Sequence, residues 1–488
     1  MKNSHRGDTA ATHRATYHFS AGRLSRIGPR IQIPSATHTL SQPWTVSWSL
    51  FLIDLETIMP NSIALPLMLP CGVTLPNRIV KAAMTEGLAD PKNGATPAHA
   101  LLYARWAQGG SGILLTGNVQ VHPDYLERPG NIVIAGPQSV EQLAGLRAMA
   151  SAATDNGAHI WMQISHAGRQ TPAAVTKEPV APSAIAVAMP GGQFGAPRAL
   201  EESEILDTIE RFAFVASVAK ETGFSGVQIH AAHGYLLSEF LSPRVNQRTD
   251  QWGGSLENRA RFLLGVVLAV RAKVGPEFPI SVKLNSSDFQ KGGFAFDECL
   301  QVVGWLEEAG VDVLEISGGN YEQPSMMGTD GLEPVFDEAM RQSTRAREAY
   351  FMDYAERIRK ITKIPLMVTG GFRSGAAMDD AIERDSIDLI GIARPLCADP
   401  DASARILSGE LSEMHKWEDG LRLGPGILGP NSRVNMIKAM NGWAAQSWFC
   451  VQILRMGRGE DPDRKMSAFK AMRLYMKNEK ETAQRLSR

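Results

Sequence analysis

The sequence predicts an α/β fold, a parallel (β/α)8 or TIM barrel, for most of its 488 residues. From residue 77 onward, short apolar runs rich in β-branched residues alternate with longer amphipathic segments. Continuous rather than alternating hydrophobicity is typical of strands buried on both faces, as in a parallel sheet. Eight strand–helix units in succession favour a closed barrel over an open doubly wound sheet.

The elements follow one another in a regular order. Residues 65–69 and 73–75 predict a small hairpin around a Pro70-Cys71-Gly72 turn, and we expect it to plug the N-terminal mouth of the barrel. Thr96-Pro97 begins the first helix and Gly109-Gly110 ends it. The predicted strands cover residues 78–84, 112–119, 159–164, 226–230, 279–285, 311–317, 365–369 and 387–393. The predicted helices cover residues 98–108, 139–156, 202–222, 256–274, 296–309, 347–361, 375–384 and 401–408.

Two segments flank the barrel, which is expected over residues 59–410. Residues 1–58 predict a disordered N-terminal extension; the first 42 are rich in Ser, Thr and Arg with the single acid Asp8, so an organelle transit peptide is the alternative interpretation. Residues 411–488 predict a helical C-terminal extension. We expect it to pack on the outside of the barrel or to form a subunit contact in a homo-oligomer. Long loops at 165–201 and 318–344 are expected to act as lids or substrate walls.

The composition excludes several classes of protein. The chain is 44% hydrophobic and 21% charged, with a net charge of -1, so no charge excess points to nucleic acid or an anionic membrane. No run is long and apolar enough to span a bilayer. Four cysteines lie far apart without metal-site spacing and indicate free thiols in a reducing compartment, which favours a cytoplasmic location.

Polar and glycine residues cluster where the predicted strands end. Because the carboxyl ends of parallel strands share one rim, which carries the active site in this fold, these residues are candidate site residues. His230, His233 and Tyr235 follow the fourth strand and can each donate a hydrogen bond or a proton. The other candidates on this rim are Ala83, Met84, Thr85, Gly117, Gln163 and Lys283.

The last two strands predict a phosphate site. Gly370-Gly371 after the seventh strand allows close approach of an anion, and Arg394 after the eighth strand can bind phosphate oxygens. Phosphate binding by these loops recurs in this fold. A literal GxGxxG at residues 424–429 contains a proline and follows no apolar strand, so we interpret it as a chance match.

Several segments together resemble the old yellow enzyme family of FMN-dependent ene reductases. They are KAAMTEGLAD near the first strand, QISHAGR at the third, HAAHGYLLSEFLSPRVNQRTDQWGGSLENRARF after the fourth, GGF after the seventh and GIARPL at the eighth. The resemblance covers roughly residues 65–400, and the block after the fourth strand is its most specific part.

The resemblance implies a role for each candidate residue. Ala83, Met84 and Thr85 would flank the isoalloxazine ring of FMN, Gly117 would lie against it, Gln163 would bond its pyrimidine side and Lys283 would place a positive charge there. Gly370, Gly371 and Arg394 would hold the phosphate. His230 and His233 would bind the carbonyl oxygen of an α,β-unsaturated substrate and Tyr235 would protonate Cα, with NADH or NADPH as the reductant. No metal is implied.

The sequence departs from the family pattern in two respects and leaves alternatives open. Lys283 stands where many members have arginine, which keeps the charge but loses the planar fork. The cysteine cluster and added dinucleotide domain of larger relatives are missing, so a 2,4-dienoyl-CoA reductase-like enzyme without those parts is one alternative. Others are a Schiff-base aldolase using Lys283, a metal-dependent hydrolase using His166, His230 and His233, and a flavin-binding module without activity.

Overall fold

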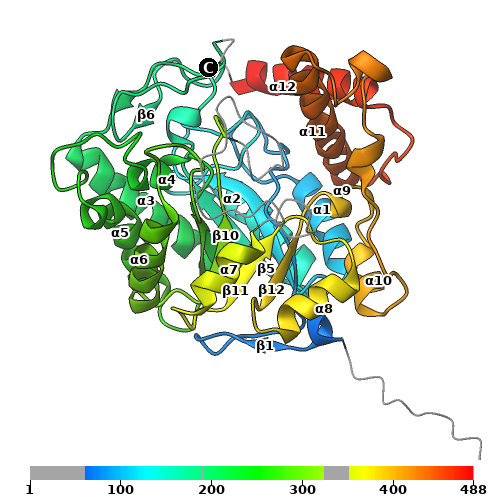
Figure 1. Cartoon of the computed structure of the whole chain (residues 1–488), viewed down its shortest axis with the longest axis horizontal. Helices are drawn as coiled ribbons and strands as arrows, with labels where there is room; N and C mark the ends of the chain where they lie inside the picture. Colours follow the sequence, from blue (N-terminus) through cyan, green and yellow to red (C-terminus); the bar gives the residue numbers. More distant parts are fainter. Residues whose placement is uncertain (1–60, 190–191, 324–350, 487–488) are drawn as a thin grey trace, which may run out of the picture. The chain divides into compact units, whose positions relative to one another are not determined.

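The computed structural model describes residues 61–189, 192–323 and 351–486, and the segment expected to be a disordered extension, 1–58, lies outside them. One compact unit runs from Met59 to Arg488. Within the described ranges, eight parallel strands close into a barrel in the order β3, β4, β5, β8, β9, β10, β11, β12 (Figure 1). The predicted (β/α)8 fold is therefore confirmed.

The barrel strands match their predicted positions closely. The largest difference is in the first strand, which ends at Lys81 rather than at residue 84, so that the chain from residue 82 to Thr85 belongs to the loop above the barrel. The strands are β3 (Ile79–Lys81), β4 (Ile113–Gln120), β5 (His159–Ser165), β8 (Gly226–Ala231), β9 (Ile280–Asn285), β10 (Val313–Ser317), β11 (Leu366–Thr369) and β12 (Leu389–Ile392).

The helices that follow these strands also confirm the prediction, although the predicted start of α7 at residue 347 lies outside the described residues. Their ends follow capping chemistry: the Ser139 hydroxyl accepts from the Gln142 amide before α2, and the Gln142 side chain accepts from the Ser139 N–H in return. These helices are α1 (Pro97–Gln108), α2 (Val140–Thr154), α3 (Glu202–Glu221), α5 (Leu256–Val274), α6 (Phe296–Glu308), α7 (Met352–Arg359), α8 (Gly375–Glu383) and α10 (Ala402–Leu407). The short helices α4 (Leu236–Leu241) and α9 (Pro395–Ala398) were not predicted.

The predicted hairpin lies at the amino-terminal mouth of the barrel. Strands β1 (Leu67–Met68) and β2 (Thr74–Leu75) pair antiparallel, at the lower edge of the molecule in Figure 1. Leu69 and Leu75 pack in one apolar cluster with inward-facing barrel residues that include Trp161. The lower barrel is therefore filled and closed by apolar side chains, which leaves the carboxyl rim as the polar end.

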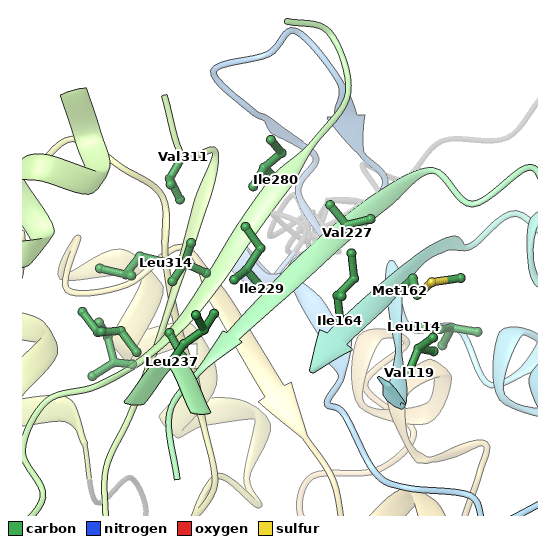
Figure 2. Close-up of a cluster of buried hydrophobic side chains, with 14 of the residues drawn as sticks. Leu114, Val119, Met162, Ile164, Val227, Ile229, Leu237, Ile280, Val311 and Leu314 are labelled. Carbon is green, nitrogen blue, oxygen red and sulfur yellow. The ribbon is translucent and has the colours of Figure 1, made fainter. Parts of the chain in front are cut away.

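A second, larger apolar layer separates the barrel from its helices. Side chains such as Ile164, Ile229 and Leu314 project from the strands into this layer (Figure 2), where they join residues of the surrounding helices. Since successive side chains of a strand point to opposite faces, the residues between them face the barrel interior. The alternation decides which side chains reach the site.

The C-terminal segment contains two helices, α11 (Asn435–Gly457) and α12 (Ala468–Leu486), and α11 packs against α1 and α9 (Figure 1). Helix α12 reaches the loop after β4, where Glu479 pairs with Arg128 and the Tyr475 ring lies 5.0 Å from the Arg128 guanidinium. The GxGxxG stretch lies around a 3-10 turn (Gly426–Leu428) and follows no barrel strand directly. None of the described helices combines the length and apolar character needed to cross a membrane.

The two long loops differ in how much of them is described. The loop after β5 holds a 3-10 turn (Gly168–Gln170) and the short paired strands β6 (Val180–Ala181) and β7 (Arg198–Ala199). The loop after β10 is described only to Gln323, and the remainder of the predicted lid at 318–344 lies outside the described residues. Further 3-10 turns cover Ser62–Ala64 and Trp417–Gly420.

Candidate active site

Four polar side chains, which we call the polar layer, meet inside the barrel on strands β5, β8, β9 and β10. Gln163 Nε2 donates to Gln228 Oε1 at 2.6 Å, and Gln228 Nε2 donates to Glu315 Oε2 at 2.8 Å. Lys283 Nζ lies 2.9 Å from Glu315 Oε1. The strand register pairs Gln163 with Gln228 and Lys283 with Glu315, and the hydrogen bond from Gln228 to Glu315 joins the two pairs. Gln163 and Lys283, both predicted site residues, are thus joined by two residues that were not predicted.

His230, His233 and Tyr235 come together directly above this layer. His230 is on β8, where the register pairs it with Lys283. The centroid of its ring lies 5.1 Å from that of His233 and 4.8 Å from that of Tyr235, which meets it edge-on at 90°. His233 has a φ of 63°, a conformation that non-glycine residues rarely adopt, and this turn brings both histidine rings to one place.

Both histidines are neutral in this environment. Burial, together with the positive charge of Lys283, lowers the pKa of His230 and of His233 well below the usual value of 6.5. The backbone N–H of Ala232 donates to His230 Nδ1 at 3.2 Å, so Nδ1 is the acceptor and the ring proton is on Nε2. His230 therefore presents one N–H donor.

His233 is held from two sides. Its backbone N–H donates to Asn285 Oδ1 at 3.1 Å, and its Nε2 lies 2.6 Å from the hydroxyl of Ser317, at the end of β10. The Asn285 amide in turn donates to Asp288 Oδ1 at 3.1 Å. The strained His233 backbone is therefore stabilised by residues from two neighbouring strand ends.

The Tyr235 hydroxyl lies 2.8 Å from the hydroxyl of Tyr321, which the sequence did not single out. Tyr235 is 4% exposed. Burial, followed by the negative charge of Glu127, raises the pKa of Tyr235 well above 10. Tyr235 is therefore a protonated phenol at neutral pH and has the form needed to donate a proton.

The loop after β3 places Ala83, Met84 and Thr85 beside the site. The Thr85 hydroxyl donates to Glu127 Oε2 at 2.7 Å, and Asn118 Nδ2 donates to the same oxygen at 2.6 Å. Met84 Sδ lies 3.4 Å from Cys397 Sγ in α9. Glu127, a residue the sequence did not indicate, thus lies beside a predicted flavin-contacting threonine.

Gly117 lies at an irregularity in the pairing of β4 with β5, a feature that is common next to active sites. Its N–H donates to Glu86 Oε1 at 2.9 Å. A Cβ at this position would overlap Glu86 Oε2 and lie 2.6 Å from the Thr85 Cα. A glycine is therefore required where the loop after β3 approaches β4.

The predicted phosphate residues lie at the ends of β11 and β12. Gly370 and Gly371 have φ values of 101° and 92°, in the region that favours glycine, and an added Cβ on Gly370 would meet no atom within 4 Å. The partly exposed Arg394 Nη2 lies 3.5 Å from Glu418 Oε1. Burial would raise the pKa of Glu418, but the charges of Arg394 and Arg373 outweigh it, so the pKa lies below its ordinary value.

The chemistry of these donors fits a phosphorylated flavin. Arg394 beside an open glycine turn suits a phosphate, and Gln163 with Lys283 suits the polar edge of a heterocycle. The buried hydroxyl of Thr369, next to Gly370 in the chain, has no hydrogen-bond partner among the described residues. A buried polar group without a partner is unfavourable, so this hydroxyl indicates a place for a polar ligand.

Two alternative chemistries find less support in the geometry. Within residues 61–189, 192–323 and 351–486, no three His, Cys, Asp or Glu side chains come together as metal ligands, so His230 and His233 lack a third ligand there. Lys283 is held by the Glu315 carboxylate, whereas a Schiff base requires a lysine available as a free amine.

Four residues of the site were not predicted: Gln228, Glu315, Glu127 and Tyr321. A signal for the first two was present, because GVQIHA, ISVKLN and VLEIS each alternate apolar and polar residues, which places the polar ones together inside the barrel. For Glu127 and Tyr321 we find no such signal. Both lie in loops, where the contacts depend on the folded chain.

Comparisons with known proteins show which family the chain belongs to. The model of the NADH:flavin oxidoreductase / NADH oxidase family matches residues 65–413. The chain is 38% identical over 355 residues to the NADH-dependent flavin oxidoreductase iliE of Hypocrea jecorina, covering 69% of this chain and 86% of that protein. It is 38% identical over 351 residues to the protein of the same name from Neonectria sp., covering 69% of this chain but only 45% of that longer protein.

A solved structure shares the fold. The old yellow enzyme homologue from Zymomonas mobilis superposes with a TM-score of 0.60 at 26% sequence identity. The match covers 72% of this chain and 94% of that one. The family match over residues 65–413 includes the barrel strands and the strand-end residues described above.

Proposed function

Because the chain belongs to the NADH:flavin oxidoreductase / NADH oxidase family, we propose that it takes hydride from NADH or NADPH and reduces the C=C bond of α,β-unsaturated carbonyl compounds. The flavin of this reaction is FMN. The observation that carries the proposal is the cluster of two neutral histidines and a protonated tyrosine, in which His230 is paired with Lys283 across β8 and β9.

The barrel residues divide between holding the cofactor and binding the substrate. Gln163 and Lys283 would hold the pyrimidine edge of FMN, and Thr85 and Gly117 would border its ring. Gly370, Gly371 and Arg394 would hold its phosphate, with Arg394 exchanging its contact to Glu418 for one to the phosphate. When bound and reduced by NADH or NADPH, FMN supplies the hydride.

The histidines would bind the substrate carbonyl oxygen. Reduction at the β-carbon places negative charge on this oxygen, and the Nε2–H of His230 can donate to it, as can His233 when its other ring nitrogen carries the proton. Removing one such donor typically costs about 2.7–4 kcal/mol of transition-state stabilisation. Because both rings are neutral, they donate hydrogen bonds without giving up a proton.

Tyr235 would supply the proton that Cα needs. Its phenol is protonated across the neutral pH range, and the edge-on contact with the His230 ring holds it next to the carbonyl-binding group. In an enone the carbonyl oxygen and Cα are both bonded to the carbonyl carbon, so the group that protonates Cα has to lie close to the groups that bind the oxygen, as Tyr235 does to His230.

We also infer a division of the chain. Residues 59–410 would form the FMN-binding barrel and residues 411–488 a helical extension that braces its upper rim through Glu479 and Arg128.

A visible spectrum of the purified protein tests the cofactor, and its response to substrate tests the reaction. We expect a flavin band, a new long-wavelength charge-transfer band on adding a phenol, bleaching by NADH or NADPH, and recovery of the band on adding 2-cyclohexenone. In Tyr235→Phe, bleaching should be unchanged and recovery slowed about 100-fold or more. A colourless protein that added FMN does not reconstitute contradicts the cofactor; a yellow protein that leaves enones unreduced contradicts the substrate class.

A further inference from the structure

Tyr321 forms a direct link between the buried Tyr235 and the outside of the site. The two hydroxyl oxygens are 2.8 Å apart, and the rings meet at 74° with centroids 5.9 Å apart. Tyr235 is buried, whereas Tyr321 is partly exposed. The Tyr321 hydroxyl is therefore one hydrogen bond from Tyr235, on a residue that is itself partly exposed.

The loop that carries Tyr321 is fastened to the loop that carries Tyr235. The Gln170 side chain joins them: its Nε2 donates to the His233 carbonyl at 2.9 Å, and its Oε1 accepts from the Tyr321 N–H at 3.1 Å. On one side of Tyr321, Asn320 Nδ2 donates to Gln290 at 2.7 Å. The hydroxyl pair is thus built into the site by side chains from separate elements.

The residue on the other side of Tyr321 is fastened by an ion pair. Glu322 Oε2 accepts from Arg169 Nη2 at 2.9 Å, and both side chains are buried. Glu322 also accepts from the Ala188 N–H in the loop after β5. Since both neighbours of Tyr321 are held, the Tyr321 ring has little freedom to leave Tyr235.

Burial makes an isolated phenolate at Tyr235 unfavourable. The pKa of Tyr235 is raised by burial, by the charge of Glu127 and by its interaction with Tyr321, while a hydrogen bond with Asn118 lowers it. Tyr235 therefore needs further hydrogen-bond donation at the moment when it loses its proton. Tyr321 is the hydroxyl in position to give it. If Tyr321 donates to the Tyr235 oxygen, the Tyr235 proton is free to point at the substrate.

We propose that Tyr321 is the second member of a proton relay and returns a proton to Tyr235 as Tyr235 protonates the substrate. The inference rests on the proposed function. Once the β-carbon has received hydride, the Tyr235 O–H bond breaks as the Cα–H bond forms. In the same step the Tyr321 O–H bond breaks as the Tyr235 O–H bond re-forms, and a solvent proton then restores Tyr321. No electrons move between the tyrosines, and the net reaction takes up one solvent proton per product.

Tyr321→Phe removes only the hydroxyl and tests the relay. We expect reduction of the flavin by NADH to be unchanged and reoxidation by 2-cyclohexenone to slow about 10-fold or more. In mixtures of H2O and D2O, a plot of the wild-type reoxidation rate against the deuterium fraction should be curved, because two protons move in the step. The same plot for the variant should be a straight line, because one proton moves. Tyr354→Phe is the matched control, because the buried Tyr354 hydroxyl in α7 has no partner within the described ranges.

A double variant distinguishes a relay from two separate roles. If Tyr321 acts only through Tyr235, Tyr235→Phe/Tyr321→Phe should be no slower than Tyr235→Phe alone. A double variant slowed by the product of the two single effects overturns the relay. So does a Tyr321→Phe protein that reoxidises at the wild-type rate.

A readout without catalysis separates this inference from the proposed function. In FMN-free protein labelled with 3-fluorotyrosine, the fluorine resonance of Tyr235, assigned by its loss in Tyr235→Phe, should shift in Tyr321→Phe and stay in place in Tyr354→Phe. A resonance that does not shift overturns the hydroxyl pair even in an active enzyme. The resonance could instead shift in Tyr321→Phe while the wild-type protein binds FMN but leaves enones unreduced. That result overturns the proposed reaction and the relay and upholds only the hydroxyl pair.

Discussion

The ion pair between Lys283 and Glu315 allows a quantitative test of how the polar layer is stabilised. Glu315 is completely buried and Lys283 nearly so, and the two charged groups are 2.9 Å apart. At this distance, an effective dielectric constant of about 20 gives an attraction of roughly 6 kcal/mol. Removing both charges from water costs several kcal/mol for each ion, so the net contribution of the intact pair is small.

Breaking the pair has a much larger effect than its net contribution. In Glu315→Gln the shape and the contact with Gln228 are kept, but the Lys283 ammonium remains buried without a counter-charge. We expect the free energy of unfolding to fall by about 3–5 kcal/mol, and by a similar amount in Lys283→Met. In the double variant both charges are gone, so its loss should be smaller than the sum of the two single losses by at least about 2 kcal/mol.

Urea unfolding of the FMN-free proteins, followed by circular dichroism, measures these differences without a contribution from bound cofactor. Glu221→Gln is the matched control: it breaks the pair of Glu221 with Arg147, in which both side chains are about half exposed and 3.1 Å apart. That change should cost less than about 1 kcal/mol. If Glu315→Gln were no more destabilising than Glu221→Gln, Lys283 would not be left in that variant as a costly unpaired buried charge.

Two further predictions concern the histidines. His230→Ala should retain FMN but lose the charge-transfer band with phenols. Its enone reduction, measured by stopped-flow reoxidation, should be about 100- to 1,000-fold slower. If the variant bound phenols as tightly as the wild-type protein does, the donor role of His230 would be contradicted. Burial and Lys283 lower the pKa of His230 and His233 in the folded state below 6.5. The unfolded chain therefore binds more protons than the folded one as the pH falls. The stability associated with each neutral histidine is present above pH 6.5 and is lost at lower pH. Below pH 6.5 each histidine should lower the free energy of unfolding by about 1.4 kcal/mol per pH unit. Urea unfolding between pH 7 and 5 should therefore show a free energy of unfolding that falls less steeply with pH in His230→Gln/His233→Gln than in wild type.

The barrel could be predicted from the sequence because each strand is marked by its own residues. Runs such as 226–230 and 279–285 are apolar, short and bounded by polar segments, so their existence follows from local pattern. Their ends were less certain, since a strand ends where its hydrogen-bond partners end. Strand β3 stops at Lys81 because the partner strands pair with it only at residues 79–81.

The site could be predicted only as far as the strand ends reveal it. Residues at these ends, such as His230 and Lys283, follow from the fold class, because all carboxyl ends of the strands share one rim. Tyr321 lies two residues beyond a Gly-Gly turn, and its contact with Tyr235 depends on the Gln170 side chain from a third loop. No spacing within the sequence encodes such a three-loop contact.

Glu315 shows a different reason for a missed residue. Its position between two apolar residues of β10 was read as part of a continuous apolar run, whereas the alternation in VLEIS points the carboxylate into the barrel. A buried charge is unfavourable by itself, and a prediction from one strand alone supplies no partner for it. Only the adjacent Lys283 on β9 makes this residue acceptable, and that adjacency depends on the register.

The charge of Lys283 links the lower and upper parts of the site. Below, it is balanced by Glu315; above, it lowers the pKa of His230 and His233 in addition to the effect of burial. A protonated histidine pair would bind anions and would compete with Tyr235 as a proton donor, whereas a neutral pair donates hydrogen bonds at neutral pH without transferring a proton. Burial and the charge of Lys283 together thus separate the roles of the three residues: the imidazoles stabilise charge on oxygen, and the phenol is left as the group that transfers the proton to carbon.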